Sequence, residues 1–161
     1  MVKCDRTDNK PEGYRFLESG LDYVYLLNGY ELEKDEDGEE MLSIKNANKL
    51  HKEIAKNIAL YKERLSYQEV RFFRSLLRLT QEQLAKELGV TSRQIQNWES
   101  KDEKSKITQP CENLLRIMIW EIYLDNDRAV KFFEENKKNR THYKMMSLKN
   151  SKNNWKIAKE A

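Results

Sequence analysis

The sequence predicts an α+β protein, in which a small N-terminal antiparallel β meander with a helix precedes an all-α domain of five helices. Short apolar runs punctuated by Asn28-Gly29 and Asp37-Gly38 predict the meander, because both pairs suit hairpin turns. From about Asn46 the apolar residues recur every three or four positions, which is typical of amphipathic helices. The expected organisation is a flexible N-terminus, a β-rich domain with a bridging helix, a helical domain and a basic tail, at residues 1–13, 14–65, 66–135 and 136–161.

The composition fits one full-sized domain plus an appendage. The chain has 161 residues, 35% of them charged and 39% hydrophobic. No stretch approaches the roughly 18 to 20 apolar residues that span a bilayer, and the first residues lack the apolar run of a signal peptide. We therefore expect a cytoplasmic protein with no membrane association. Cys4 and Cys111 are too few and too far apart for a disulfide framework or a zinc site, so no metal or cofactor is expected.

The positive charge is concentrated at the C-terminal end. Residues 136–161 contain eight Lys or Arg and one acidic residue, whereas the whole chain has a net charge of only +3. Few apolar residues accompany this charge, so the segment is expected to be disordered or to fold on DNA or a partner. A solubilising extension and an electrostatic arm both remain open at this point.

In the first third, the apolar runs lie at Tyr23–Leu27, Tyr30–Leu32 and Met41–Ile44 and predict the strands. The acidic turn from Glu33 resembles the opening of a calcium loop. Its twelfth position, however, is Ile44 rather than a carboxylate, so a solvated turn is expected. The next segment, NANKLHKEIAKNIALYKERL, has the period of an amphipathic helix that covers the sheet or bridges to the next unit.

From Ser66 onward, three capping boxes of the form S/T-x-x-E/Q mark successive helix starts. The three pairs are Ser66 with Glu69, Thr80 with Gln83, and Thr91 with Gln94. They predict helices over 67–78, 81–88 and 92–100. A fourth helix is predicted from Pro110 along PCENLLRIMIWEIYL, and a fifth in DNDRAVKFFEEN.

The segment TQEQLAKELGVTSRQIQNWE has the form of a helix-turn-helix. Gly89 ends the second helix where the chain must turn through positive φ, and the third helix turns only Ile95 and Trp98 inward. Between Ser92 and Asn97 there is neither Glu nor Lys, the usual residues of a solvated face. Arg can fork onto guanine and Asn or Gln onto adenine, so this face suits the major groove. The alternative is a plain helical hairpin.

This segment resembles the helix-turn-helix of the Cro/phage-repressor (XRE) family. It matches the family pattern at Gln81, Leu84, Ala85, Leu88, Gly89, Val90, Ile95, Trp98 and Glu99. The resemblance implies a lambda-repressor-like five-helix domain with Ser92, Arg93, Gln96 and Asn97 contacting bases. It also implies that Gln81, Gln94 and Lys101 lie near phosphates. Thr80 and Gln81 begin the second helix, where free N–H groups favour an anion.

The layout of the preceding part is similar to that of MqsA-type antitoxin regulators, which join a small β-rich domain to such a helix-turn-helix. Their two Cys-x-x-Cys pairs are missing here, so a zinc ribbon is not carried over. The leading hypothesis is a sequence-specific DNA-binding repressor, either an antitoxin-like autoregulator with a toxin partner or a stand-alone regulator. The alternative is a protein-interaction module with weak DNA binding. No nucleophile with its base, phosphate loop or metal set is present, so no enzyme is expected.

The fourth helix has a surplus of apolar residues around its circumference. We expect Leu114, Leu115, Met118 and Ile122 to pack on the core. Ile119, Trp120 and Tyr123 remain, and either Phe132 and Phe133 or the same helix of a second subunit would cover them. The second subunit is favoured, since one recognition helix contacts too few base pairs. A homodimer on an inverted-repeat operator follows.

Overall fold

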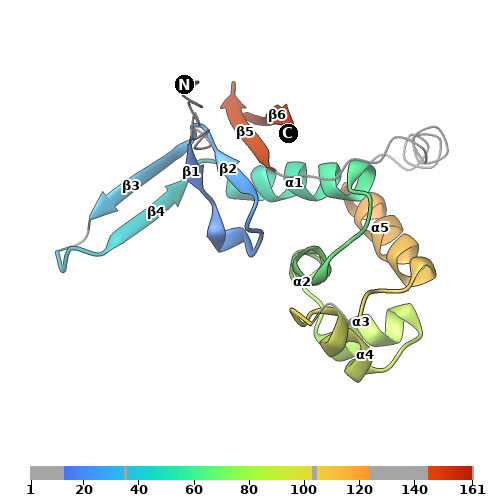
Figure 1. Ribbon diagram of the computed structural model, residues 1–161. Coiled ribbons are helices and arrows are strands. Elements are labelled where there is room, and N and C mark those ends of the chain that lie inside the picture. Colours follow the sequence, from blue (N-terminus) through green and yellow to red (C-terminus); the bar gives the residue numbers. More distant parts are fainter. Residues whose placement is uncertain (1–12, 35, 103–104, 124–144, 161) are drawn as a thin grey trace, which may run out of the picture.

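The computed structural model describes residues 13–34, 36–102, 105–123 and 145–160. Within them the fold is mixed α and β, as predicted (Figure 1). In chain order the elements are β1 (Tyr14–Arg15), a 3-10 turn η1 (Leu17–Ser19), β2 (Val24–Leu26), β3 (Tyr30–Lys34), β4 (Glu40–Ile44), α1 (Ala47–Tyr61), α2 (Tyr67–Leu76), α3 (Gln81–Leu88), α4 (Ser92–Trp98), α5 (Gln109–Tyr123), β5 (Met146–Ser151) and β6 (Asn154–Glu160).

The strands form two separate sheets. A four-stranded sheet has the order β1-β2-β5-β6, with β2 and β5 parallel and the other neighbours antiparallel. β3 and β4 form a two-stranded antiparallel sheet in which Leu32 lies opposite Leu42. The hairpin turn at Asp37-Gly38 is therefore confirmed. The prediction of one continuous meander is wrong. Across Asn28-Gly29 the strands β2 and β3 do not pair with each other, because β2 pairs with β1 and β5 instead.

The second half of the predicted tail is part of the N-terminal sheet. Met146, Leu148 and Trp155 are buried, and Val24 pairs with Met146 across more than a hundred residues. Neither a disordered tail nor one that folds only on a partner describes residues 146–160. These three large apolar side chains pack into the buried cluster and so hold two strands that are otherwise rich in Lys and Asn. The predicted fifth helix, with Phe132 and Phe133, lies outside the described residues, as does most of the predicted flexible N-terminus.

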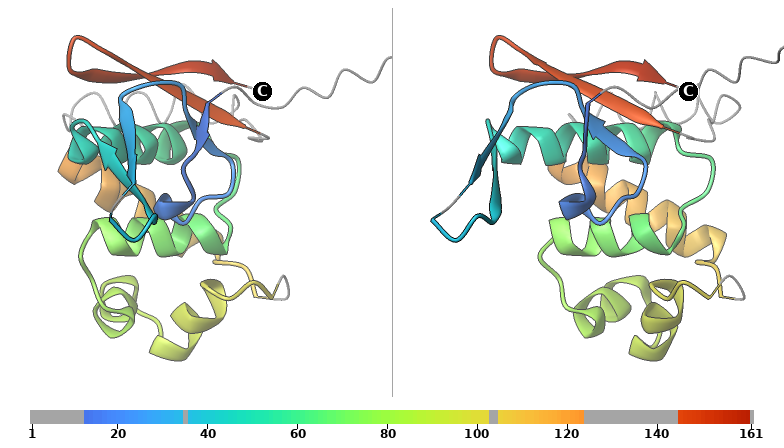
Figure 2. Two further views of the ribbon diagram at one scale, coloured as in Figure 1. Left: turned by 90° about the vertical axis from the view of Figure 1, so that its left-hand side faces the viewer. Right: turned by 60° about the vertical axis from the view of Figure 1, so that its left-hand side comes forward.

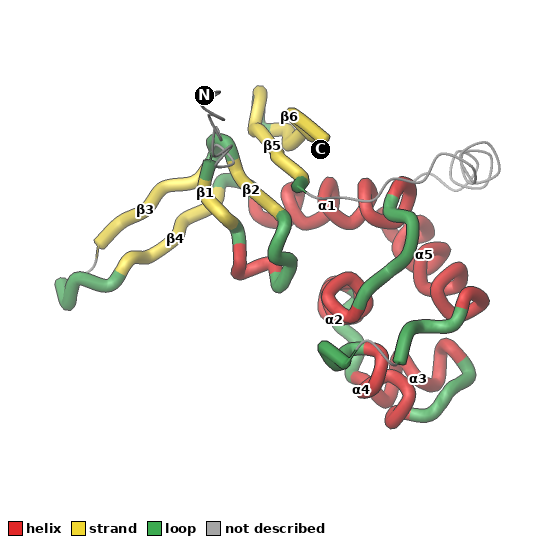
Figure 3. Tube along the Cα trace, viewed as in Figure 1, coloured by secondary structure: helices red, strands yellow, loops and turns green. Residues whose placement is uncertain are grey.

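The helices stack below the sheet. Figures 2 and 3 show α1 directly under the four-stranded sheet and the α3–α4 pair at the opposite end of the molecule, with α2 between them. α5 packs against α1. The buried residues form one continuous cluster from Leu26 in the sheet through Ile54 in α1 to Ile95 in α4. The core therefore has no break at the boundary predicted between residues 65 and 66.

Buried charged residues connect the β-rich part of the core to the helices and the helices to one another. Glu69, fully buried in α2, accepts a hydrogen bond from the Tyr23 hydroxyl (2.8 Å) and lies 3.3 Å from the Lys62 ammonium. Arg116, fully buried in α5, pairs with Glu112 at 2.7 Å. It also donates to the carbonyl groups of Ile58, Ala59 and Lys62 at the end of α1. These contacts fix the helical unit to the β-rich unit.

The buried Arg116 also explains a correction to the predicted face of α5. The inward residues are Glu112, Leu115, Arg116, Ile119 and Trp120, whereas Leu114 and Ile122 are exposed. The prediction used apolar residues alone to choose the inward face, which differs from the observed one by a rotation of the helix. Because Arg116 finds a carboxylate and three carbonyl groups inside, its face turns inward together with Ile119 and Trp120.

Candidate nucleic-acid interface

α3 and α4 form a helix-turn-helix whose geometry follows from local signals. Gly89 ends α3 with φ +67°, in the left-handed region that favours glycine. The capping boxes at Thr80 and Thr91 are both formed, each through its hydroxyl and the glutamine three residues later. α3 has the predicted bounds, while α4 ends at Trp98, two residues before the predicted end.

Two side chains attach α4 to the core. Ile95 is fully buried and Trp98 is 5% exposed, as predicted, and they meet Leu84 and Leu88 of α3 in the same cluster. The side of α4 opposite to Ile95 and Trp98 faces solvent. Of the predicted base-contacting residues, Arg93, Gln96 and Asn97 are exposed and Ser92 is half-buried. The structure thus brings these four residues together on one short helix.

A buried carboxylate fixes this helix to its neighbours. Glu99, 2% exposed at the end of α4, accepts hydrogen bonds from the Arg74 guanidinium (2.9 Å) and the Gln81 amide (2.9 Å). Arg71 donates to its backbone carbonyl group at 2.8 Å. One residue therefore connects α2, the start of α3 and the end of α4. The sequence pattern contained Glu99 but gave it no role, and no motif indicated that Arg71 and Arg74 would bind it.

The predicted phosphate-side residues divide into two groups. Thr80, Gln81 and Gln94 make hydrogen bonds within the protein, the first and third in the capping boxes and Gln81 with Glu99. Lys101 is exposed in the loop after α4.

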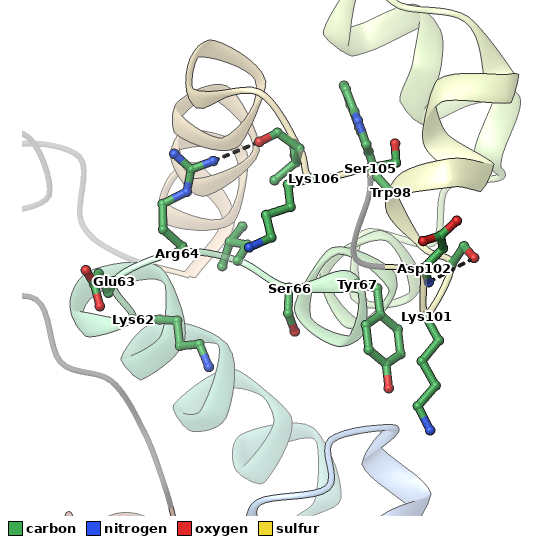
Figure 4. A pocket seen from close by; sticks show the side chains of 13 residues that line it. Lys62, Glu63, Arg64, Ser66, Tyr67, Trp98, Lys101, Asp102, Ser105 and Lys106 are labelled. Atoms are coloured by element: carbon green, nitrogen blue, oxygen red, sulfur yellow. Dashed lines mark hydrogen bonds between the residues drawn. The ribbon is translucent and has the colours of Figure 1, made fainter.

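That loop borders a hollow of about 450 Å³ against the α1–α2 link. Figure 4 shows Lys101 extending from its edge and Lys106 on its other side. Tyr67 and Trp98 also line the hollow. A second exposed cation, Lys106, therefore borders the same hollow as Lys101, and no motif in the sequence indicated it.

The predicted dimer residues are placed differently from the expectation. Ile119 is fully buried and Trp120 is 4% exposed inside the chain, so neither offers a surface to a second subunit. Tyr123 is half-buried, with the Lys52 ammonium 5.5 Å from its ring centre. Ile119 and Trp120 therefore pack inside the chain, whereas Leu114, Ile117 and Ile122 of the same helix remain exposed.

The described residues lack two further features. No group of three or more His, Cys, Asp or Glu side chains in this part of the chain could hold a metal ion. None of its helices is both long and apolar enough to cross a membrane.

Comparison with protein families gives one match, and it falls on this site. Residues 70–110 match the helix-turn-helix family HTH_3. The matched segment runs from α2 to the start of α5 and contains the whole Glu99 network. It supports the XRE-type resemblance and a DNA-binding function for this part of the chain. No curated protein and no solved structure showed significant similarity to the chain.

Proposed function

We propose that this protein is a sequence-specific transcription repressor that binds an inverted-repeat operator as a homodimer. The observation that carries the proposal is the solvent-facing side of α4. Arg93, Gln96 and Asn97 are exposed there, on a helix that Ile95, Trp98 and Glu99 hold rigidly. A rigid helix loses little conformational entropy on binding, and the exposed side chains are those that hydrogen bond to base edges.

In this proposal α4 enters the major groove. Arg93, near its N-terminal end, donates two hydrogen bonds to guanine O6 and N7, and Asn97, one turn further, pairs with adenine N6 and N7. Gln96 and Ser92 contact neighbouring bases. The side of α4 that carries Ile95 and Trp98 remains on the protein core.

Contacts to the sugar-phosphate backbone set the register of α4 in the groove. At the start of α3 the N–H groups of Gln81 and Glu82 suit a phosphate group, because the capping box already uses those of Thr80 and Gln83. The hydrogen bond from Gln81 to Glu99 orients its amide without using all of its donors. Gln94, Lys101 and Lys106 contact phosphates on the other side of α4. Repression follows from occupancy of the operator, with no covalent step.

A second candidate is a protein-interaction module, of which an MqsA-type antitoxin would be one form. The exposed β3–β4 hairpin favours it, because this hairpin is a surface that the DNA-binding face does not use. Such a module would bind DNA weakly and without sequence preference.

Selection of bound DNA from a random pool, at one fixed salt concentration, separates the two candidates. The repressor is expected to enrich an inverted repeat with half-sites about 34 Å, one helical turn, apart. A matched selection with Arg93→Ala should lose preference at one position of each half-site. If wild-type protein enriches no sequence over the starting pool, the proposed repressor is wrong.

A further inference from the structure

The β3–β4 arm, defined as residues 30–45, is an exposed hairpin that projects from the body of the molecule (Figure 1). Among the described strands, β3 and β4 pair only with each other. Leu32 is 47% exposed and Met41 61% exposed, on opposite faces of the hairpin. A two-stranded hairpin alone is marginally stable in water, so these open faces and edges are suited to a further contact.

The charge of the β3–β4 arm defines the chemistry of that contact. Residues 30–45 contain seven Asp or Glu and two Lys, and one of these, Lys45, already pairs with Glu31 at 3.2 Å. A surface with this excess of carboxylates repels nucleic acid and attracts a cationic protein surface.

A cationic surface of this kind is present on the same chain. The basic hairpin, β5 and β6 at residues 146–160, contains four Lys and one Glu. Lys149 and Lys156 are exposed and lie directly opposite each other across the two strands. Like charges in this position destabilise a sheet, and an anionic group placed over them removes the penalty.

DNA bound by α4 is not that anionic group. The basic hairpin lies at the end of the molecule opposite to α4 in each of the views of Figures 1 and 2. Duplex DNA held in contact with α4 would have to wrap around the protein to reach Lys149 and Lys156.

The arm of the same chain does not cover the basic hairpin either, because its base is fixed beside it. Trp155 donates through Nε1 to the Lys45 carbonyl group at 3.1 Å, and Asn28 exchanges hydrogen bonds with the backbone of Asn150. At Gly29, with φ +78°, a Cβ would lie 2.8 Å from Trp155. From this base β3 and β4 run outward, which carries the acidic turn away from the hairpin (Figure 1).

We infer that the β3–β4 arm docks on the basic hairpin of a second copy of this chain, and that the second copy returns the same contact. Because one chain carries both surfaces, the pairing is self-complementary about a two-fold axis and closes as a dimer. The inference supplies a contact for the homodimer of the proposed function. The experiment contains no DNA, so a negative result would not contradict the base contacts proposed for α4.

Sedimentation velocity, from low to high micromolar concentration, tests the contact with two charge-reversed variants. In Glu33→Lys/Glu36→Lys/Glu40→Lys the arm becomes basic, and in Lys149→Glu/Lys156→Glu the hairpin becomes acidic; all five residues are exposed. Wild-type protein is expected to be dimeric. Each variant alone should dissociate with a constant about tenfold or more higher, because like charges then face each other. An equimolar mixture of the two variants should form dimers again, since both contacts become complementary.

The control is Glu82→Lys/Glu87→Lys/Glu121→Lys, which changes the net charge as the arm variant does but on exposed positions of α3 and α5. It should dimerise like the wild type, and circular dichroism should show that all variants are folded. A monomeric wild type would overturn the inference, and the expected occupant of the arm would then be a different protein with a cationic surface. Dimers that survive both reversals, or a mixture that stays monomeric, would overturn it as well.

Discussion

Replacing Trp155 by Ala tests whether the C-terminal hairpin is a structural part of the fold. Trp155 is 4% exposed, packs against Gly29 and donates from its indole N–H to the Lys45 carbonyl group. Truncating a buried Trp removes its apolar burial, leaves a cavity and here also removes a hydrogen bond. We expect the free energy of unfolding to fall by about 3 to 5 kcal/mol. That is a large fraction of the roughly 5 to 15 kcal/mol that keeps a domain folded.

Urea denaturation followed by circular dichroism measures this loss as a shift of the midpoint. Ala158→Ser, at an exposed position of the same strand, is the control and should change the free energy of unfolding by less than about 0.5 kcal/mol. If residues 146–160 were a solvated tail, Trp155→Ala would change the free energy of unfolding as little as the Ala158→Ser control does. A loss below about 1 kcal/mol would therefore refute the structural role of the hairpin.

Two other substitutions test polar groups of the core. Glu99→Gln leaves the half-buried Arg74 guanidinium without its carboxylate, so we expect a loss of about 2 to 3 kcal/mol by thermal or urea denaturation. Glu87→Gln, on the exposed side of α3, should be silent, and equal melting temperatures for the two variants would contradict the role of Glu99. Burial lowers the pKa of His51 below its ordinary value of 6.5, so the folded state favours the neutral imidazole. Its contribution to stability is present above about pH 6.5 and is lost as the pH falls below that value. The free energy of unfolding should therefore drop more between about pH 7.5 and 5 in wild type than in His51→Phe, and equal drops would contradict this assignment.

The helix-turn-helix could be predicted from the sequence because its signals are local. Each capping box spans four residues, and Gly89 marks the turn by its own conformational freedom. The spacing of Ile95 and Trp98 then determines which side of α4 faces outward. None of these inferences required knowledge of a distant segment.

The errors concern contacts between distant segments and buried charges. Nothing near Val24 in the sequence indicates that its partner is Met146, and a strand rich in Lys and Asn resembles a solvated tail until its partner is known. The predicted core face of α5 did not include Arg116, because a charge is costly to bury alone. Its partners, Glu112 and three carbonyl groups of α1, appear only in the folded chain. Arg116 shares the inward face of α5 with Ile119 and Trp120.

The most direct test of the central claim, that α4 contacts base edges, is the affinity of Arg93→Ala and Asn97→Ala for the selected operator and for random DNA at the same salt concentration. Each variant is expected to lose about 1 to 3 kcal/mol on the operator, with specificity relaxed at one base pair and little change on random DNA. Lys52→Ala, which removes an exposed positive charge from α1, is the control and should change neither affinity. Equal losses on the operator and on random DNA would show that Arg93 and Asn97 contact only the backbone, and would contradict the claim.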